Sequence, residues 1–363
     1  MQQALTQGEL ACGGVLTVDL AALRRNYRIL CAAAPNSAIA GVVKADAYGL
    51  GAIPVTRALL AEGCRHFFVA HLAEALDLRD VVPPDLDLIV LHGPLPGAEA
   101  MFAAQGIVPV LNTQDQIMAW SALARSEGRD LPAWLHLDTG MNRFGLSEAE
   151  VEAAALDGID LRGVMSHFAC ADTPDHPANA AQLALFNRLR AKLPKLPASL
   201  GASSGVFLGN DAQLNILRPG AALYGLNPTP GRPNPMLPVV RLDAVAMQTR
   251  DVPAGTPVGY GHTETTAVPA RLATLSVGYA DGYRRALAGK AAAWFGDRRM
   301  KLIGRVSMDS MVVDATGLDI QPGMLAELIG PHCDLDALAE QAGTIGYEIL
   351  TSLGRRFARR HIG

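Results

Sequence analysis

The sequence predicts an α/β protein in which an N-terminal (β/α)8 barrel of the TIM type precedes a mostly-β C-terminal domain. Up to about residue 226, short apolar runs alternate with amphipathic segments, as they do in a barrel. A proline-rich stretch at 227–238 then separates them from β-branched runs with closely spaced turns. The length of 363 residues fits two domains, which we place at 15–235 and 236–363, the second with or without 1–14.

Eight apolar runs are each expected to form one strand of the barrel. Their hydrophobicity is continuous rather than alternating, which suits strands buried on both faces of a parallel sheet. The runs are 38–43, 66–70, 86–91, 107–111, 133–138, 161–167, 198–203 and 217–223. Helical patterns lie beside them at 20–33, 53–62, 113–126, 147–156 and 178–192. An open doubly wound sheet is the alternative, but no GxGxxG motif follows the first run.

The C-terminal domain is expected to be a β structure with few helices. Its strand candidates are 239–248, 256–260, 271–277, 301–306 and 311–314. Helical periodicity is scarce until residues 335–342. The segment 13–18, with the sequence GGVLTV, is a further strand candidate that could join this domain.

Composition and charge argue against several classes of function. Hydrophobic residues make up 50% and charged residues 18% of the chain, which suits a large core and not a disordered protein. The net charge is −4 without a Lys/Arg cluster, so we expect no nucleic-acid partner. No apolar run reaches the roughly 18 residues of a membrane span, and the N-terminus has no secretory pattern. We therefore expect a cytoplasmic protein without a membrane partner. The five cysteines are odd in number and form no CxxC pair, so neither a disulfide nor a metal site is expected.

Lys44 is the first candidate for catalysis. The chain has five lysines, and Lys44 is the only one in the first 191 residues. It ends the first apolar run of the barrel, and barrels place catalytic groups at the carboxyl ends of their strands. Apolar surroundings favour the neutral amine, which can form a Schiff base. The alternative is a lysine that extends from a strand end into solvent.

Two later segments suggest a phosphate site at the same mouth of the barrel. The sequence GASSG at 201–205 and the sequence RPGA at 218–221 follow late strand candidates. Barrels often bind phosphate with the loops after these strands, through backbone N–H groups and a hydroxyl. A lysine and a phosphate cup at one mouth suit pyridoxal phosphate, although ordinary turns also explain such short motifs.

The chain resembles alanine racemases over nearly its whole length. The motifs that carry the resemblance are VVKADAYGLG (42–51), LDTGMNRFG (137–145), SHFACAD (166–172), RPGAALYG (218–225), VGYGHT (258–263), VGYADGY (277–283) and GRVSMD (304–309). The resemblance implies a pyridoxal-phosphate enzyme, with a barrel and a C-terminal β domain, that interconverts L- and D-alanine. It also implies a homodimer with shared active sites.

By this resemblance, Lys44 is the Schiff-base lysine and one of two catalytic bases. Tyr260 is the other base and reaches the site from the partner subunit. Two bases are needed because racemisation removes the Cα proton from one face and returns a proton to the other. The resemblance also implies a hydrogen-bonded relay of His167 and Arg218 with this tyrosine. Arg218 faces the pyridine nitrogen of the cofactor and, because it stays charged, keeps that nitrogen unprotonated.

The resemblance assigns the remaining site residues to the cofactor and the substrate. Tyr48 and Ser204 bind the phosphate, together with the backbone N–H groups of Gly220 and Ala221. Arg143 binds the substrate carboxylate or the phenolic oxygen of the cofactor. Met308 and Asp309 belong to the substrate-side segment of the partner subunit, and the Met308 N–H lies near the substrate carboxylate. Tyr279 narrows the entrance to the site.

Three positions depart from the family pattern. Many members carry a carbamylated lysine where this chain has His136, which cannot hold a carbamate. Arg143 must then be oriented by His136, by an anion such as chloride, or by water. The residue before the phosphate serine is often asparagine and is Ser203 here. A C-terminal tyrosine that contacts the phosphate in some members is absent from SLGRR at 352–356.

Three rival functions differ in measurable ways. A racemase with broad amino-acid specificity would also act on serine, lysine or arginine, but such relatives tend to be exported. A barrel decarboxylase with the same cofactor is disfavoured by the VGYG and GRVSMD motifs. A non-catalytic pyridoxal-phosphate carrier would not exchange the α-hydrogen of alanine, and such carriers generally lack the C-terminal β domain.

Overall fold

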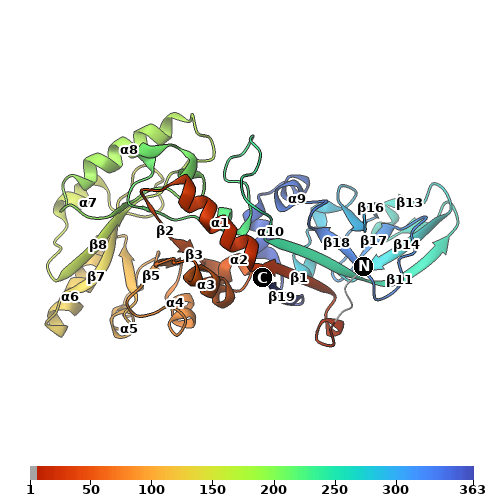
Figure 1. Cartoon of the computed structure of the whole chain (residues 1–363), viewed down its shortest axis with the longest axis horizontal. Helices are drawn as coiled ribbons and strands as arrows, with labels where there is room; N and C mark the ends of the chain where they lie inside the picture. Colours follow the sequence, from red (N-terminus) through yellow and green to blue (C-terminus); the bar gives the residue numbers. More distant parts are fainter. Residues whose placement is uncertain (1–5) are drawn as a thin grey trace. The chain divides into compact units, whose positions relative to one another are not determined.

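The computed structural model describes residues 6–363, which divide into two compact units (Figure 1). One unit is Leu23–Leu237, and the other combines Pro238–Gly363 with the described residues up to Ala22. The N-terminal segment differs from the expected division, because residues 15–22 belong to the C-terminal unit and not to the barrel. The reason is strand β1 (Gly14–Asp19), which is hydrogen-bonded into the sheet of that unit.

The unit Leu23–Leu237 is the expected (β/α)8 barrel. Seven strands form a parallel sheet in chain order: β3 (Gly41–Val42), β4 (His66–Val69), β5 (Asp87–Val90), β6 (Val108–Leu111), β7 (Leu131–His136), β8 (Ile159–Met165) and β9 (Ala198–Ser199). The eighth strand, β10 (Ile216–Leu217), pairs in parallel with β2 (Ala38–Ile39), which directly precedes β3. Beyond β10, Arg218 N donates to Gly201 O (3.0 Å) and Val42 N donates to Pro219 O (3.2 Å). These bonds connect the last strand to both of its neighbours and close the ring.

The helices of the barrel follow from local signals at their ends. They are α1 (Leu20–Ala33), α2 (Lys44–Gly49), α3 (Ala52–Ala61), α4 (Leu72–Leu78), α5 (Glu99–Ala104), α6 (Gln114–Glu127), α7 (Glu148–Ala153) and α8 (Pro177–Arg190). Thr113 caps the start of α6, and Gly128 ends it in the left-handed conformation. Figure 1 shows α5, α6, α7 and α8 on the outer side of the strands. The sequence did not predict α2, α4 and α5. Helices α4 and α5 are too short for a helical period to stand out, and α2 is mostly a left-handed turn over residues 45–48.

Two predicted strands end earlier than expected. The run 198–203 is a strand only over β9, and the run 217–223 only reaches Leu217. Short 3-10 helices follow, namely η2 (Ser204–Phe207) and η4 (Ala221–Tyr224). Pro219 has no N–H to donate to a ladder, so the chain leaves the sheet while its apolar side chains stay buried. The result is a pair of helix N-termini at the carboxyl ends of neighbouring strands.

The second unit is a β structure built around one long strand, β11 (Val240–Val252). The sheet order is β14-β17-β16-β15-β18-β11-β1-β19, and β14 also pairs with β11, which closes six of these strands into a barrel. The remaining strands of this sheet are β14 (Ala270–Leu275), β15 (Ala292–Phe295), β16 (Arg298–Ile303), β17 (Met311–Asp314), β18 (Leu325–Ile329) and β19 (Ala358–Ile362). A separate hairpin consists of β12 (Pro257–Val258) and β13 (Glu264–Thr265), and the helices are α9 (Leu335–Ala342) and α10 (Gly346–Ser352). Figure 1 shows β1 beside β11, so the candidate segment 13–18 does join this domain.

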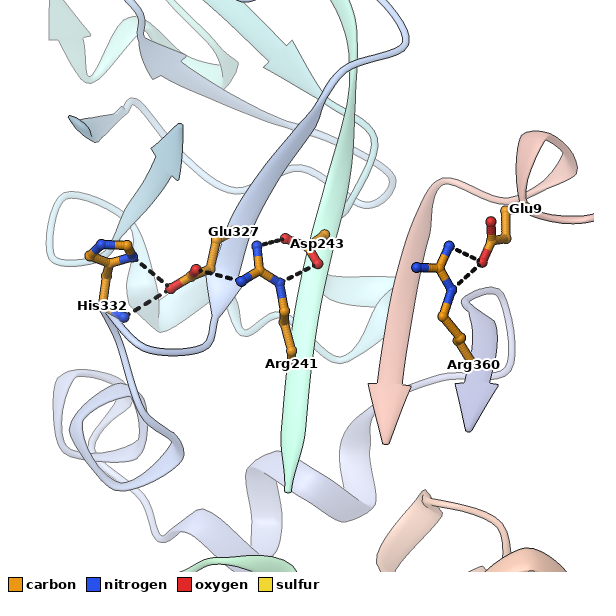
Figure 2. A network of polar contacts seen from close by, with 6 residues as sticks. All are labelled: Glu9, Arg241, Asp243, Glu327, His332 and Arg360. Carbon is orange, nitrogen blue, oxygen red and sulfur yellow. Dashed lines mark hydrogen bonds and ion pairs between the residues drawn. The ribbon is translucent and has the colours of Figure 1, made fainter. Parts of the chain in front are cut away.

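A buried polar network ties β11 to β18 in this unit (Figure 2). Asp243 and Glu327 lie directly opposite each other on the two strands, and both are buried. Two like charges in such a pair would repel, but the Arg241 guanidinium lies between them, 2.7 Å from Asp243 Oδ2 and 3.1 Å from Glu327 Oε2. His332 adds hydrogen bonds to Glu327, and Arg360 on β19 pairs with Glu9 in the segment before β1. The network therefore stabilises the pairing of distant segments.

Residues 6–363 contain no helix that is both long and apolar enough to cross a bilayer.

Candidate active site

Lys44 lies at the carboxyl end of the first barrel strand, next to a short left-handed turn. Val43 N donates to Phe68 O at 2.9 Å, which continues the pairing of β3 with β4 up to the residue before Lys44. The next four residues, Ala45 to Tyr48, have φ between +52° and +58°. This conformation costs L-residues roughly 1 kcal/mol each, so a specific backbone path is being enforced beside Lys44. The half-buried amine has a pKa below its ordinary value, because burial disfavours the ammonium and because Arg143 and Arg218 are also positive.

Arg218 is a buried cation at the carboxyl end of β10. Its guanidinium donates to Ser166 O at 2.6 Å and to the Ser199 hydroxyl, and Arg218 Nη2 lies 3.3 Å from His167 Nδ1. Burial lowers the pKa of Arg218 to about 9, so it is still charged at neutral pH. Within residues 6–363, no carboxylate forms an ion pair with it. The Arg218 guanidinium can therefore donate a hydrogen bond to an acceptor other than a carboxylate.

His167 is neutral and accepts the hydrogen bond from Arg218. Burial, and then the charge of Arg218, hold the pKa of His167 well below its ordinary value. An arginine can only donate, so Nδ1 of the neutral ring must be the acceptor and Nε2 carries the proton. Gln182 on α8 fixes this strand end, because its Nε2 donates to His167 O at 3.0 Å.

The loops after β9 and β10 meet beside Tyr48. Ser203 Oγ accepts hydrogen bonds from Gly220 N (3.2 Å) and Ala222 N (3.1 Å). The Gly220 N–H, expected to face a phosphate, is therefore bonded to Ser203. Ser204 and Ala221 are the first residues of η2 and η4, so their N–H groups have no acceptor within the helix.

His136 is buried at the end of β7, and Asn112 determines its tautomer. Asn112 Nδ2 donates to Leu91 O and Val110 O, both at 3.0 Å, so its Oδ1 is left as the acceptor. His136 Nδ1 lies 2.8 Å from that oxygen and must carry the proton, which leaves Nε2 as an acceptor. Burial, and then the charge of Arg218, lower the pKa of His136 to about 4, so the ring is neutral at pH 7.

Neutral His136 is expected to make the fold sensitive to acid. Because its folded pKa of about 4 lies below the ordinary value of about 6.5, only the unfolded chain takes up a proton between these values. The contribution of neutral His136 to the free energy of unfolding is complete above pH 6.5. About 2 kcal/mol of this contribution is lost from pH 7 to pH 5. The urea midpoint of the wild type should therefore fall over this interval, and that of His136→Gln should fall less. Equal decreases in the two proteins would contradict the assigned protonation state.

Arg143 lies on the loop that connects β7 to α7. The first half of the loop is held by Asp138 Oδ1, which accepts from the N–H groups of residues 140, 141 and 142 at 2.9–3.1 Å. Arg143 itself is exposed, and its guanidinium lies over the Phe144 ring, 6.0 Å from the centroid. Because this loop leaves the carboxyl end of β7, Arg143 lies at the same mouth of the barrel as Lys44, and its charge lowers the pKa of both Lys44 and His136.

The remaining candidates belong to the C-terminal unit. Tyr279 N donates to Ser307 O at 3.0 Å, so the motifs VGYADGY and GRVSMD lie side by side. Tyr260 is 71% exposed and Met308 is 52% exposed. Asp309 accepts from Arg356 Nη1 at 2.6 Å. The Arg305 backbone lies beside Gly259, so the segment of Tyr260 also adjoins the motif GRVSMD. All four residues are exposed in the single chain.

The sequence interpretation missed three residues of the barrel mouth. Asn112 follows the predicted strand 107–111, so its position at a strand end was the available signal. Ser203 was noted only as a departure, although it connects two loops. Glu74 on α4 bonds to Ala45 N at 2.5 Å, a contact that no local pattern could reveal. Among residues 6–363, no group of three or more His, Cys, Asp or Glu side chains is placed to hold a metal ion.

The chain is similar to known proteins over both units. The family model for the N-terminal domain of alanine racemase matches residues 18–228, and the model for the C-terminal domain matches residues 239–361. A catabolic alanine racemase of Mesorhizobium japonicum is 52% identical, over 98% of this chain and 95% of that protein. A catabolic alanine racemase of Agrobacterium fabrum is 50% identical, over 100% of this chain and 95% of that protein.

Solved structures agree with the sequence relatives. The alanine racemase of Bartonella henselae, with covalently bound pyridoxal phosphate, superposes with a TM-score of 0.92 at 39% identity and covers 96% of this chain and 99% of that chain. The alanine racemase of Streptomyces coelicolor has a TM-score of 0.94 at 33% identity and covers 99% of this chain and 100% of that chain.

Proposed function

Because the chain belongs to the alanine racemase family, and is therefore a pyridoxal-phosphate enzyme that interconverts L- and D-alanine, we propose that Lys44 and Tyr260 are its two proton-transfer residues. When bound, pyridoxal phosphate withdraws electrons from Cα of the amino acid and so makes its proton removable. The observation that carries the proposal is the pairing of a lysine of lowered pKa with a buried guanidinium at one barrel mouth.

The residues at the mouth fit this cofactor. Arg218 is a buried cation that lacks a carboxylate partner among the described residues, and so can donate to an unprotonated ring nitrogen. Lys44 would hold the aldehyde end, and the hydroxyls of Tyr48 and Ser204, with the Ala221 N–H, would hold the phosphate. Because Arg218 keeps its proton at neutral pH, it would disfavour protonation of a ring nitrogen held beside it.

The two bases divide the work between the faces of Cα. Lys44 Nζ must be neutral to accept a proton, and its burial and the two neighbouring arginines favour that state. Tyr260 Oη would serve the opposite face, delivered by the second subunit of a homodimer. Its high exposure in the single chain supports this assignment, since the ring is free to enter a site on another copy.

Arg143 would bind the substrate carboxylate by charge. The backbone N–H of Met308, which lies in one segment with Asp309, would also bind the carboxylate. Arg143 needs an orienting acceptor, which carbamylated lysine supplies in many relatives. His136 offers one, because its Nε2 carries a lone pair while Asn112 holds Nδ1. We propose that this neutral imidazole takes the place of the carbamate. Tyr279 would narrow the entrance.

Purified protein incubated with L-alanine in deuterated solvent tests the proposed function. We expect D-alanine to form and the α-hydrogen to exchange. The absence of both would indicate a carrier instead. Rates with serine, lysine and arginine that match the alanine rate would indicate a broad racemase.

A methyl group at position 220 is expected to weaken cofactor binding. A Cβ atom built on Gly220 would lie 2.4 Å from Tyr48 Oη, far inside van der Waals contact. Tyr48 is buried and packs on Tyr224, with ring centroids 4.8 Å apart, so its hydroxyl would be displaced. Gly220→Ala should raise the dissociation constant for pyridoxal phosphate by about tenfold or more. Gly8→Ala is the control, since no atom lies within 4 Å of its added methyl; equal affinities in the two variants would contradict the assignment.

The named relatives favour a role in alanine breakdown, because the two described above are catabolic enzymes. The same activity would supply D-alanine for peptidoglycan. Deletion of the gene separates the roles: a requirement for D-alanine would indicate peptidoglycan supply, and loss of growth on alanine would indicate catabolism. A cytoplasmic location belongs to this proposal, and the five free cysteines support it.

A further inference from the structure

The carboxylate of Glu74 connects the residue after Lys44 with the end of the neighbouring barrel strand. Its Oε2 accepts hydrogen bonds from Ala70 N at 2.7 Å and from His71 N at 3.0 Å. Its Oε1 accepts from Ala45 N at 2.5 Å. Glu74 is the third residue of α4, so one side chain caps this helix and also binds the neighbour of Lys44.

The contact falls where the backbone most needs support. Ala45 is the first of four consecutive residues in the left-handed conformation, which L-residues rarely adopt. Ala45 and Asp46 are exposed, so packing in the core does not hold the start of the turn. Later residues of the turn are held by other bonds, such as Ala47 N to Val43 O and Ala52 N to Asp46 Oδ1, whereas Glu74 supplies the acceptor at its first residue.

Glu74 is also the negative charge that acts on Lys44. Burial lowers the pKa of Lys44, and the charges of Arg143 and Arg218 lower it further, whereas Glu74 raises it. A neutral side chain of the same size at position 74 would leave only the influences that favour the free amine.

We propose that Glu74 is a positioning residue for Lys44: its carboxylate fixes the start of the left-handed turn and thereby the direction of the lysine side chain. The inference rests on the proposed role of Lys44 and adds the group that holds it in place. Capping of α4 alone is the competing explanation.

Helix α7 supplies a matched control for capping. Glu150 occupies the same third position, and its Oε2 accepts from Ser147 N at 2.8 Å in an equivalent capping box. In the part of the chain that the structure describes, Glu150 forms no hydrogen bond with the turn after Lys44. Glu150→Gln thus removes the charge from a cap of the same kind without touching Lys44.

Hydrogen–deuterium exchange of the full-length holoenzymes distinguishes the two explanations. In Glu74→Gln, we expect the peptide that covers 43–51 to exchange about tenfold faster, because a charge-assisted bond is lost. The same peptide should be unchanged in Glu150→Gln. We expect kcat to fall about ten- to a hundredfold in Glu74→Gln, since small displacements of a catalytic group are costly, and to stay within about twofold in Glu150→Gln.

The reactivity of Lys44 gives a readout that does not depend on turnover. After the cofactor is removed with hydroxylamine, Lys44 can be acetylated with acetic anhydride at a series of pH values. Peptide mass spectrometry measures the extent of acetylation and so gives the pH at which it is half-maximal. This midpoint should move to lower pH in Glu74→Gln and stay unchanged in Glu150→Gln.

The proposal is overturned if peptide 43–51 exchanges at the wild-type rate in Glu74→Gln. It is also overturned if Glu74→Gln and Glu150→Gln change the exchange of that peptide equally. If Glu74→Gln does not fold, Glu74→Asp decides: its shorter side chain cannot reach Ala70 and Ala45 together, so the same faster exchange is expected, and its absence is decisive against the proposal. Failure of the proposed function would look different, because racemisation would then survive Lys44→Ala.

Discussion

Replacement of Lys44 by alanine is expected to lower kcat for racemisation by at least about a thousandfold. The loss should exceed that of an ordinary buried side chain, because under the proposed function one substitution would remove both a base and the amine that holds the cofactor. The variant should also lack the visible absorption of the bound cofactor. Polarimetry and an absorption spectrum of the purified variant measure the two effects.

A matched variant separates this loss from a general effect of removing a lysine. Lys195 is exposed in the same unit, and Lys195→Ala should keep both activity and colour. Added methylamine should restore part of the lost activity in Lys44→Ala, since a free amine can accept the proton in the space left by the side chain. Retention of more than about a tenth of the wild-type rate in Lys44→Ala would be incompatible with its role as a base.

The architecture of the barrel was predictable because burial on both faces leaves a direct trace in the sequence. The run 107–111 is apolar throughout, and so is the run 66–70 after its first residue, His66; β6 and β4 fall inside these runs. The short helices α4 and α5 left no such trace. Strand β19 was missed for a related reason: its sequence, ARRHI, is mostly polar, and its place follows from pairing with β1, far away in the chain.

The candidate site was predictable to the extent that its residues sit at strand ends. Lys44 and Arg218 follow strands β3 and β10, and His136 ends β7, so all three lie at one mouth of the barrel. The left-handed turn after Lys44 was not predictable, because Ala45 and Ala47 have no preference for that conformation. Contacts such as Asn112 with His136 depend on the register of neighbouring strands, which local patterns do not specify.

Removal of the Tyr260 hydroxyl is expected to separate α-hydrogen exchange from racemisation. Tyr260→Phe keeps the exposed ring, so folding should be unaffected, but the base on one face of Cα is lost. Racemisation should fall by about a hundred- to ten-thousandfold. Since no enzyme shifts the equilibrium, kcat/KM must fall by the same factor in both directions. One enantiomer, the one whose Cα hydrogen faces Lys44, should still exchange with deuterated solvent without inversion.

The control is Tyr347→Phe, which makes the same chemical change at another exposed tyrosine of the unit and should leave both rates as they are. Proton NMR follows exchange, and chiral chromatography follows inversion. Undiminished inversion in Tyr260→Phe would remove this residue from the proposed pair of bases.

Mixing two inactive variants shows which subunit supplies the phenol. In a dimer of one Lys44→Ala chain and one Tyr260→Phe chain, a site shared between subunits combines intact Lys44 from one chain with intact Tyr260 from the other. The second site then carries both substitutions. Random reassociation of equal amounts should therefore restore about a quarter of the wild-type activity, since about half of the dimers are mixed and each has one intact site. If both bases came from one chain, every site would lack one of them, and the mixture would stay as inactive as its components.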